Sequence, residues 1–89
     1  SNIFTIGTHT LRTGEKVRVF SDDGDLPENI ESNTVYFVIR ISSTEIKLAS
    51  SVTNAQNNVP ITVFGGTKLF VESRVSDKSS GDIWFTCTV

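Results

Sequence analysis

The stretch that decides the fold occupies residues 34–41 and reads Thr-Val-Tyr-Phe-Val-Ile-Arg-Ile. Seven of its eight positions are β-branched or aromatic, which favours a β-strand with apolar residues on both faces. Ser-Ser-Thr follows at 42–44, and residues 45–49 then alternate as Glu-Ile-Lys-Leu-Ala. We therefore predict a β-hairpin over residues 35–49. Its first arm should be covered on both faces, and Glu45 and Lys47 of its second arm should meet water.

Two further hairpins are predicted around glycine turns. Gly14 should supply a positive φ in a turn within residues 9–20. The glycine pair at 65–66 separates two β-rich runs, so residues 61–64 should pair with residues 67–75.

One short helix is predicted between the second and third hairpins, over residues 50–58. Serine can cap a helix start, and Val52 and Ala55 share a face that should pack against the sheet. Asn57 or Asn58 tolerates the left-handed conformation that ends a helix.

The predicted fold class is mainly β, a small antiparallel sheet or partly open β-barrel of three hairpins with one short helix. Residues 1–89 should form a single domain, from which Ser1 and Asn2 are excluded as a candidate tag remnant. Phe37→Ala should cost about 3–5 kcal/mol if Phe37 lies in the core. The predicted core residues are Val17, Val19, Val35, Phe37, Ile39, Ile46, Leu48, Leu69 and Val71.

Composition disfavours several kinds of partner. The formal net charge is −2, and the eight basic residues are spread along the chain, so nucleic acid is an unlikely partner. A nucleic-acid-binding small barrel would need exposed stacking aromatics near Arg12, Lys16 and Arg18. No apolar run approaches the ~18 residues that span a bilayer, so we predict a soluble protein with no membrane partner.

The sequence predicts no enzyme, no cofactor and no metal. The single histidine, His9, lies between two threonines, where a structural or surface role is favoured over that of a catalytic base. The single cysteine, Cys87, occupies an apolar-face position of a predicted strand, where a thiol is usually buried and inert. The glycine pair at 65–66 lacks the following lysine and helix of a phosphate-binding loop.

An acidic loop interrupts the strand pattern after residue 21. Asp22, Asp23 and Asp25 do not match the calcium-loop spacing, and we expect a solvated loop, with residues 26–30 covering one end of the sheet. Together with Tyr36 and Trp84, this loop leaves open a carbohydrate-binding or adhesin-type module, because such groups contact sugars.

Several pieces of the chain, taken in order, resemble a small β-rich module of tailed-bacteriophage virion proteins. They are residues 9–18, 26–27, 33–39, 46–50 and 54–55. Residues 66–69, 73–78 and 81–83 are similar in particular to a segment of the tail sheath proteins of contractile-tailed cyanophages. The resemblance implies a structural role in the virion tail, synthesis in the host cytoplasm, other tail subunits as partners, and no catalytic residues. After Ile83 the sequence departs from the Gly-His-Pro stretch expected of that family.

The C-terminal run begins at Ile83 and ends at Val89, with no charged residue and no proline. If this strand lies at a sheet edge, its unpaired backbone groups are a template for pairing with another copy or with a different tail protein. The alternative is that it completes the domain's own sheet.

Overall fold

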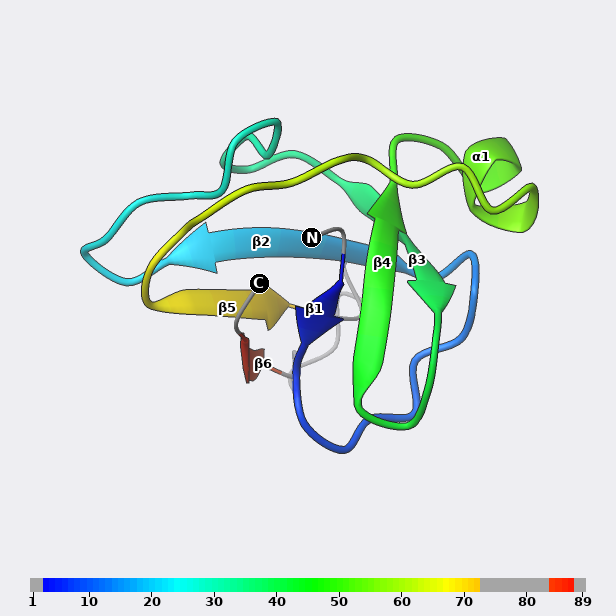
Figure 1. Ribbon diagram of the computed structural model, residues 1–89, viewed down its shortest axis with the longest axis horizontal. Helices are drawn as coiled ribbons and strands as arrows, with labels where there is room; N and C mark the ends of the chain where they lie inside the picture. The colour runs from blue at the N-terminus through cyan, green and yellow to red at the C-terminus, as the bar shows by residue number, and fades with distance from the viewer. Residues whose placement is uncertain (1–2, 73–83, 88–89) are drawn as a thin grey trace.

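Six β-strands and one short helix make up the fold in the computed structural model, which describes residues 3–72 and the backbone of 84–87 (Figure 1). The fold is mainly β, as the sequence predicts. The elements are β1 (Phe4–Thr5), β2 (Lys16–Ser21), β3 (Tyr36–Arg40), β4 (Glu45–Ala49), α1 (Val52–Gln56), β5 (Leu69–Glu72) and β6 (Trp84–Cys87).

All strand pairings are antiparallel, and the spatial order of the open sheet is β1-β4-β3-β2-β5-β6. β2 joins the two halves of this sheet. Lys16 and Val17 pair with β3, whereas the four residues from Arg18 to Ser21 pair with β5. Figure 1 shows β2 crossing the molecule, with β5 alongside its second part. The sheet therefore consists of a β1-β4-β3 half and a β5-β6 half that share β2.

The central hairpin is confirmed: β3 and β4 pair from Phe37 opposite Ala49 to Arg40 opposite Ile46. Both faces of β3 are covered, as predicted. Tyr36 and Val38 face the main core, whereas Ile39 packs with Ala49 and Ala55 in a second, smaller cluster.

Two of the core residues predicted for this strand, Val35 and Phe37, are not fully buried. Phe37 is half-buried against the second cluster, and Val35 is half-buried just before the strand. Because successive strand residues point to opposite faces, the alternate set, Tyr36 and Val38, lines the main core instead. Of the other predicted core residues, Ile39 is buried in the second cluster, and Val17, Val19, Ile46, Leu48, Leu69 and Val71 are buried in the main core.

Helix α1 covers the second face of β3 and β4, and its local signals were predicted correctly. The Ser51 hydroxyl accepts a hydrogen bond from the Asn54 N–H at 3.0 Å, which caps the first turn. Asn58 follows the helix with a φ of 57°. Ala55 is buried against the sheet, but Val52 is 43% exposed, so its predicted burial is wrong.

The first predicted hairpin, over residues 9–20, is wrong. Gly14 does lie in a turn, with a φ of 97°. Residues 9–11, however, form no strand, and the neighbours of β2 are β3 and β5. The N-terminal segment hydrogen-bonds instead to the β3–β4 turn, where Ile6 N–H donates to Thr44 O and His9 N–H donates to Ser43 O, both at 2.9 Å.

The third predicted hairpin, over residues 61–75, is also wrong within the described part of the chain. Ile61 N–H donates to Leu48 O at 2.8 Å, and Phe64 forms an isolated bridge with Glu28. The glycines at 65–66 turn the chain into β5, which pairs with β2 and β6. A Cβ on Gly66 would come within 2.9 Å of Pro27 Cγ, so close packing also requires glycine there. Residues 73–75 of this prediction lie outside the described residues.

The loop after β2 covers one end of the sheet, as predicted. Pro27 and Ile30 are buried, and Leu26 packs against the main core. Within the described residues, no helix is long and apolar enough to cross a membrane.

Candidate interaction surface on the outer face of β2 and β5

The outer face of β2 and β5 carries two rows of paired side chains. Val17 and Val19 point into the core, so Arg18 and Phe20 between them lie on the opposite face of β2. The register places Phe20 opposite Phe70 and Arg18 opposite Glu72. Directly opposed residues of this kind have Cβ atoms about 4.5–5.5 Å apart, so each pair can interact.

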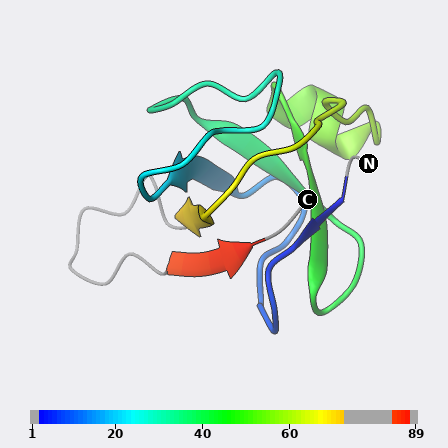
Figure 2. The same ribbon diagram turned by 60° about the vertical axis from the view of Figure 1, so that its left-hand side comes forward.

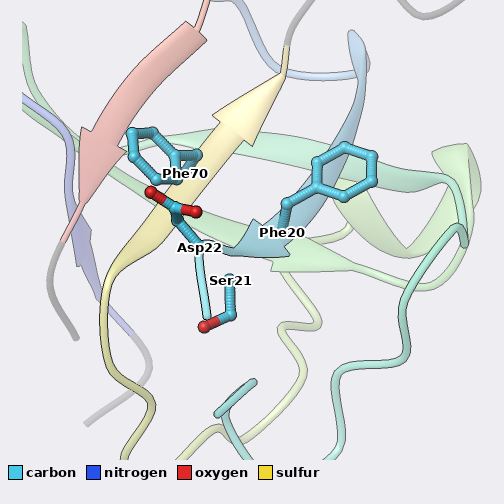
Figure 3. Close-up of a pocket in the computed structure, with 4 residues that line it drawn as sticks. All are labelled: Phe20, Ser21, Asp22 and Phe70. Atoms are coloured by element: carbon cyan, nitrogen blue, oxygen red, sulfur yellow. The ribbon is translucent and has the colours of Figure 1, made fainter. Parts of the chain in front are cut away.

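A hollow of about 320 Å³ opens on this surface and is lined by Phe20, Ser21, Asp22 and Phe70 (Figure 3). Both phenyl rings are half-buried, and Asp22 is exposed at the end of β2. In the view of Figure 3, the rings project from neighbouring strands and the Asp22 carboxylate lies toward the Phe70 side. The hollow thus combines two aromatic walls with one carboxylate.

Backbone contacts hold the acidic loop beside this hollow. Asp22 N–H donates to Lys68 O at 2.9 Å, and the Ser21 hydroxyl donates to Thr67 O at 2.7 Å. Asp25 and Thr67 exchange two further hydrogen bonds, one of them through the Thr67 hydroxyl at 3.0 Å. The Asp22 backbone is therefore fixed, while its carboxylate makes no hydrogen bond or ion pair with the rest of the described chain.

The second row of this surface is an ion pair between Arg18 and Glu72. Arg18 Nη1 lies 3.7 Å from Glu72 Oε1, and the two side chains are 33% and 9% exposed. This contact places the Arg18 guanidinium beside a carboxylate of its own chain.

The three basic residues of the candidate nucleic-acid patch do not form an aromatic and cationic surface. Arg12 and Lys16 are exposed, whereas Arg18 is half-buried and ion-paired with Glu72. Among the described residues, the half-buried rings of Phe20 and Phe70 share the hollow with Asp22 and with no lysine or arginine. This arrangement gives an anionic polymer little electrostatic attraction to the hollow.

Tyr36 and His9 are not among the described residues that line the hollow. Tyr36 is only 5% exposed, and its hydroxyl accepts a hydrogen bond from Glu31 N–H at 2.8 Å, so it belongs to the core rather than to a sugar platform. His9 is 5% exposed, and its Nδ1 accepts a hydrogen bond from Leu11 N–H at 3.0 Å, a structural contact. Trp84 and Cys87 belong to β6 by their backbones, and their side chains lie outside what the structure describes.

The acidic residues of the loop remain at the surface. Asp22, Asp23 and Asp25 are all exposed. Across residues 3–72, no group of three His, Cys, Asp or Glu side chains gathers into an arrangement that could hold a metal ion.

Phe20 and Phe70 are surface residues that the sequence patterns had not singled out. A local signal was present, because the alternation in Lys16–Ser21 places Phe20 on the same face as Arg18. The same rule places Phe70 opposite to Leu69 and Val71. What the alternation cannot reveal is that two residues fifty positions apart become direct neighbours, since that depends on strand pairing.

Comparison of the chain with known protein families, curated proteins and solved structures finds no significant match.

Proposed function

We propose that the protein is a structural or assembly module of a phage tail, related to tail sheath proteins, which acts by associating with other protein chains and catalyses no reaction. The observation that carries this proposal is the position of β6 at one end of the sheet. The resemblance of the ordered sequence segments to tail sheath proteins supports the phage part of the proposal. By that resemblance, the partners are other tail subunits or further copies of the chain, and the location is the virion.

The two ends of the sheet differ in a way that supports association through β6. β1 at one end is only two residues long, and its Phe4 is fully buried, so it offers little backbone for pairing. β6 at the other end is four residues long and lies within a run that has no charge and no proline. Proteins usually protect sheet edges with short strands, charged side chains or prolines. β6 contains no charged residue and no proline.

The contribution of β6 to its own domain is part of the structure. Trp84–Cys87 pairs with Glu72 through Leu69 of β5, so one edge of this strand is used within the domain's own sheet. Among the described strands, only β5 pairs with β6, along one of its two edges. Pairing with another chain through the outer edge is compatible with the pairing to β5.

Hydrogen exchange on the β6 amides tests the association directly. In an antiparallel edge strand, alternate N–H groups point toward the neighbour and away from it. In dilute protein, we expect slow exchange for alternate amides among residues 84–87 and fast exchange for those between them. As light-scattering mass rises with concentration, or as a tail protein is added, the fast amides should become protected. Fast amides that stay unprotected in an assembled sample would refute edge pairing.

The phage assignment has its own test. Intact phage virions should be purified and analysed by mass spectrometry. We expect peptides of this chain to co-purify with the tails. Intact virions that lack these peptides would refute the assignment to the tail.

A carbohydrate-binding module is the second candidate, and the hollow between Phe20 and Phe70 is the observation that favours it. Aromatic rings provide apolar surface of the kind that contacts sugars. Against it, Tyr36 is buried. A glycan array would support this candidate by binding that is lost in the Phe70→Leu variant.

A further inference from the structure

We infer that the peptide bond between Asp23 and Gly24 is a self-modification site, at which Asp23 is converted to isoaspartate through a succinimide. This change loosens the loop that joins β2 to the segment covering one end of the sheet. The inference is independent of the proposed association with other chains. It rests on the chemistry of an exposed Asp-Gly pair and on the hydrogen bonds that enclose this pair in the fold.

The two reacting groups are adjacent in the chain. The Gly24 backbone nitrogen attacks the carboxyl carbon of the Asp23 side chain; an N–C bond forms, a C–O bond breaks, and one water leaves with the amide proton. Water then opens the succinimide ring. Opening at the side-chain carbonyl restores aspartate, whereas opening at the main-chain carbonyl gives isoaspartate. The net change is an isomerisation, and water is its only co-reactant.

Both groups are accessible in the folded protein. Asp23 and Gly24 are exposed. Neither the Asp23 carboxylate nor the Gly24 N–H makes a hydrogen bond or ion pair within the described chain. Because glycine has no side chain, its nitrogen is the least obstructed in its approach to the preceding carboxyl group, and its backbone rotates most freely.

The neighbouring acidic residues lack this combination. Asp22 and Asp25 are exposed in the same loop, but they are followed by Asp23 and Leu26. The side chains of these following residues obstruct ring closure. The loop therefore contains one reactive position and two internal controls.

Hydrogen bonds on both sides of the pair make the fold sensitive to the modification. Asp22 N–H donates to Lys68 O at 2.9 Å. Thr67 N–H donates to Asp25 O at 2.8 Å, and Asp25 N–H donates to the Thr67 hydroxyl at 3.0 Å. Asp22 and Asp25 thus hold two consecutive residues of one segment, and the Asp23–Gly24 pair spans the distance between them.

Isoaspartate adds one carbon atom to the main chain within this closed loop. Gly24 lies directly against Thr67, because a Cβ on Gly24 would collide with the Thr67 hydroxyl. The longer main chain therefore has no room on the Thr67 side of the loop. We expect it to bulge outward and to break the hydrogen bonds that join Asp25 to Thr67.

Ageing of the folded protein tests the site. The protein is incubated under physiological conditions, digested, and analysed for isoaspartate by electron-transfer mass spectrometry and by labelling with isoaspartyl methyltransferase. We expect isoaspartate to accumulate at Asp23 and to be absent from Asp22 and Asp25. A synthetic peptide of residues 19–29 gives the rate without the fold. Conversion of the peptide but not of the folded protein, or equal conversion at all three aspartates, would overturn the inference.

The structural consequence is measured on the separated isoaspartate form. The amides of Asp25 and Thr67 should lose their protection against hydrogen exchange. The thermal midpoint should fall by about 4–8 °C, the shift that corresponds to one typical hydrogen bond in a domain of this size. Unchanged exchange at both amides would overturn the proposed loosening of the loop.

Two variants separate isomerisation from other effects of ageing. Asp23→Gly removes the carboxyl group and adopts the φ of 60° at this position without strain, so its Asp25 and Thr67 amides should stay protected throughout the incubation. Asp23→Asn forms the same succinimide by loss of ammonia and should reach the isoaspartate form sooner. An equal loss of protection in aged Asp23→Gly would overturn the inference, because that variant cannot isomerise at residue 23.

Discussion

The β3–β4 hairpin and the β2–β5 pair are built from similar residues but end in different surroundings. β3 is covered on one face by the main core, where Tyr36 is buried, and on the other by α1, where Phe37 is half-buried against the second cluster. The inner face of β2 and β5 lies on the main core, whereas Phe20 and Phe70 are half-buried on the outer face and line a hollow. Figure 2 shows α1 beside β3 and β4 and away from β5 and β6. α1 thus adds a second buried cluster of Ile39, Ala49 and Ala55 on the outer face of the hairpin.

Removal of β6 should lower the thermal stability of the protein more than any of the other changes proposed for the two regions. A chain that ends at Asp82 loses the strand that pairs with β5, and with it one neighbour of the half that α1 does not cover. We expect the thermal midpoint to fall by more than the ~4–8 °C that corresponds to 1 kcal/mol in a domain of this size. Circular dichroism would measure it. An unchanged midpoint, together with a light-scattering mass that falls to that of a monomer, would mean that β6 pairs between chains instead.

Leu48→Ala should cost more stability than any other single substitution proposed for the two regions. Leu48 is fully buried on β4, and its loss leaves a cavity in the main core. We expect a loss of about 2–5 kcal/mol in the free energy of unfolding, measured by urea titration. Ile41→Ala is the control, because Ile41 is 41% exposed beside the same hairpin and should cost less than about 1 kcal/mol. Equal losses would contradict the packing described for β4.

Phe37→Ala and Phe70→Ala compare the two regions directly. Phe37 is half-buried against the cluster under α1, so we expect a loss of about 2 kcal/mol rather than the roughly 3–5 kcal/mol of a fully buried ring. Phe70 is half-buried at the open hollow and should cost about 1 kcal/mol. Both losses of unfolding free energy are measured in the same urea titrations. A larger loss for Phe70→Ala than for Phe37→Ala would show that Phe70 is packed more tightly than Phe37 and would contradict this comparison.

Ser51→Ala tests how firmly α1 is held on the second face. The substitution removes the acceptor for Asn54 N–H at the start of α1 and should cost about 1 kcal/mol. Ser43→Ala, an exposed serine in the β3–β4 turn whose hydroxyl makes no hydrogen bond with the described chain, is the control and should lie within about 0.5 kcal/mol of the unchanged protein. If the cap matters only locally, amide exchange should accelerate within α1 while β3 stays protected.

Calcium should have the smallest effect. Asp22, Asp23 and Asp25 are exposed on a loop held by backbone contacts, and only a ligand that binds the native state raises the thermal midpoint. Millimolar calcium should leave the midpoint within error in a thermal melt. A rise of several degrees would revive the adhesin alternative, and Asp22→Asn should then abolish that rise.

Local patterns in the sequence determined the elements whose contacts are close in the chain. The β3–β4 hairpin needs only a short turn between its arms, and the α1 cap needs only Ser51 and Asn54, so both were predicted. The strand character of β2 and the inward Val17 and Val19 also follow from alternation alone. These features depend on periodicity and nearby hydrogen bonds, which a sequence displays directly.

Tertiary structure alone decided which strands became neighbours. Gly14 and the glycines at 65–66 form turns as predicted, yet neither turn joins two paired strands, because β2 finds its partners in β3 and β5. The same long-range pairing brings Phe20 against Phe70 and creates the hollow. A turn residue specifies a local backbone conformation, whereas strand pairing depends on which apolar faces can be buried together, and that is a property of the whole chain.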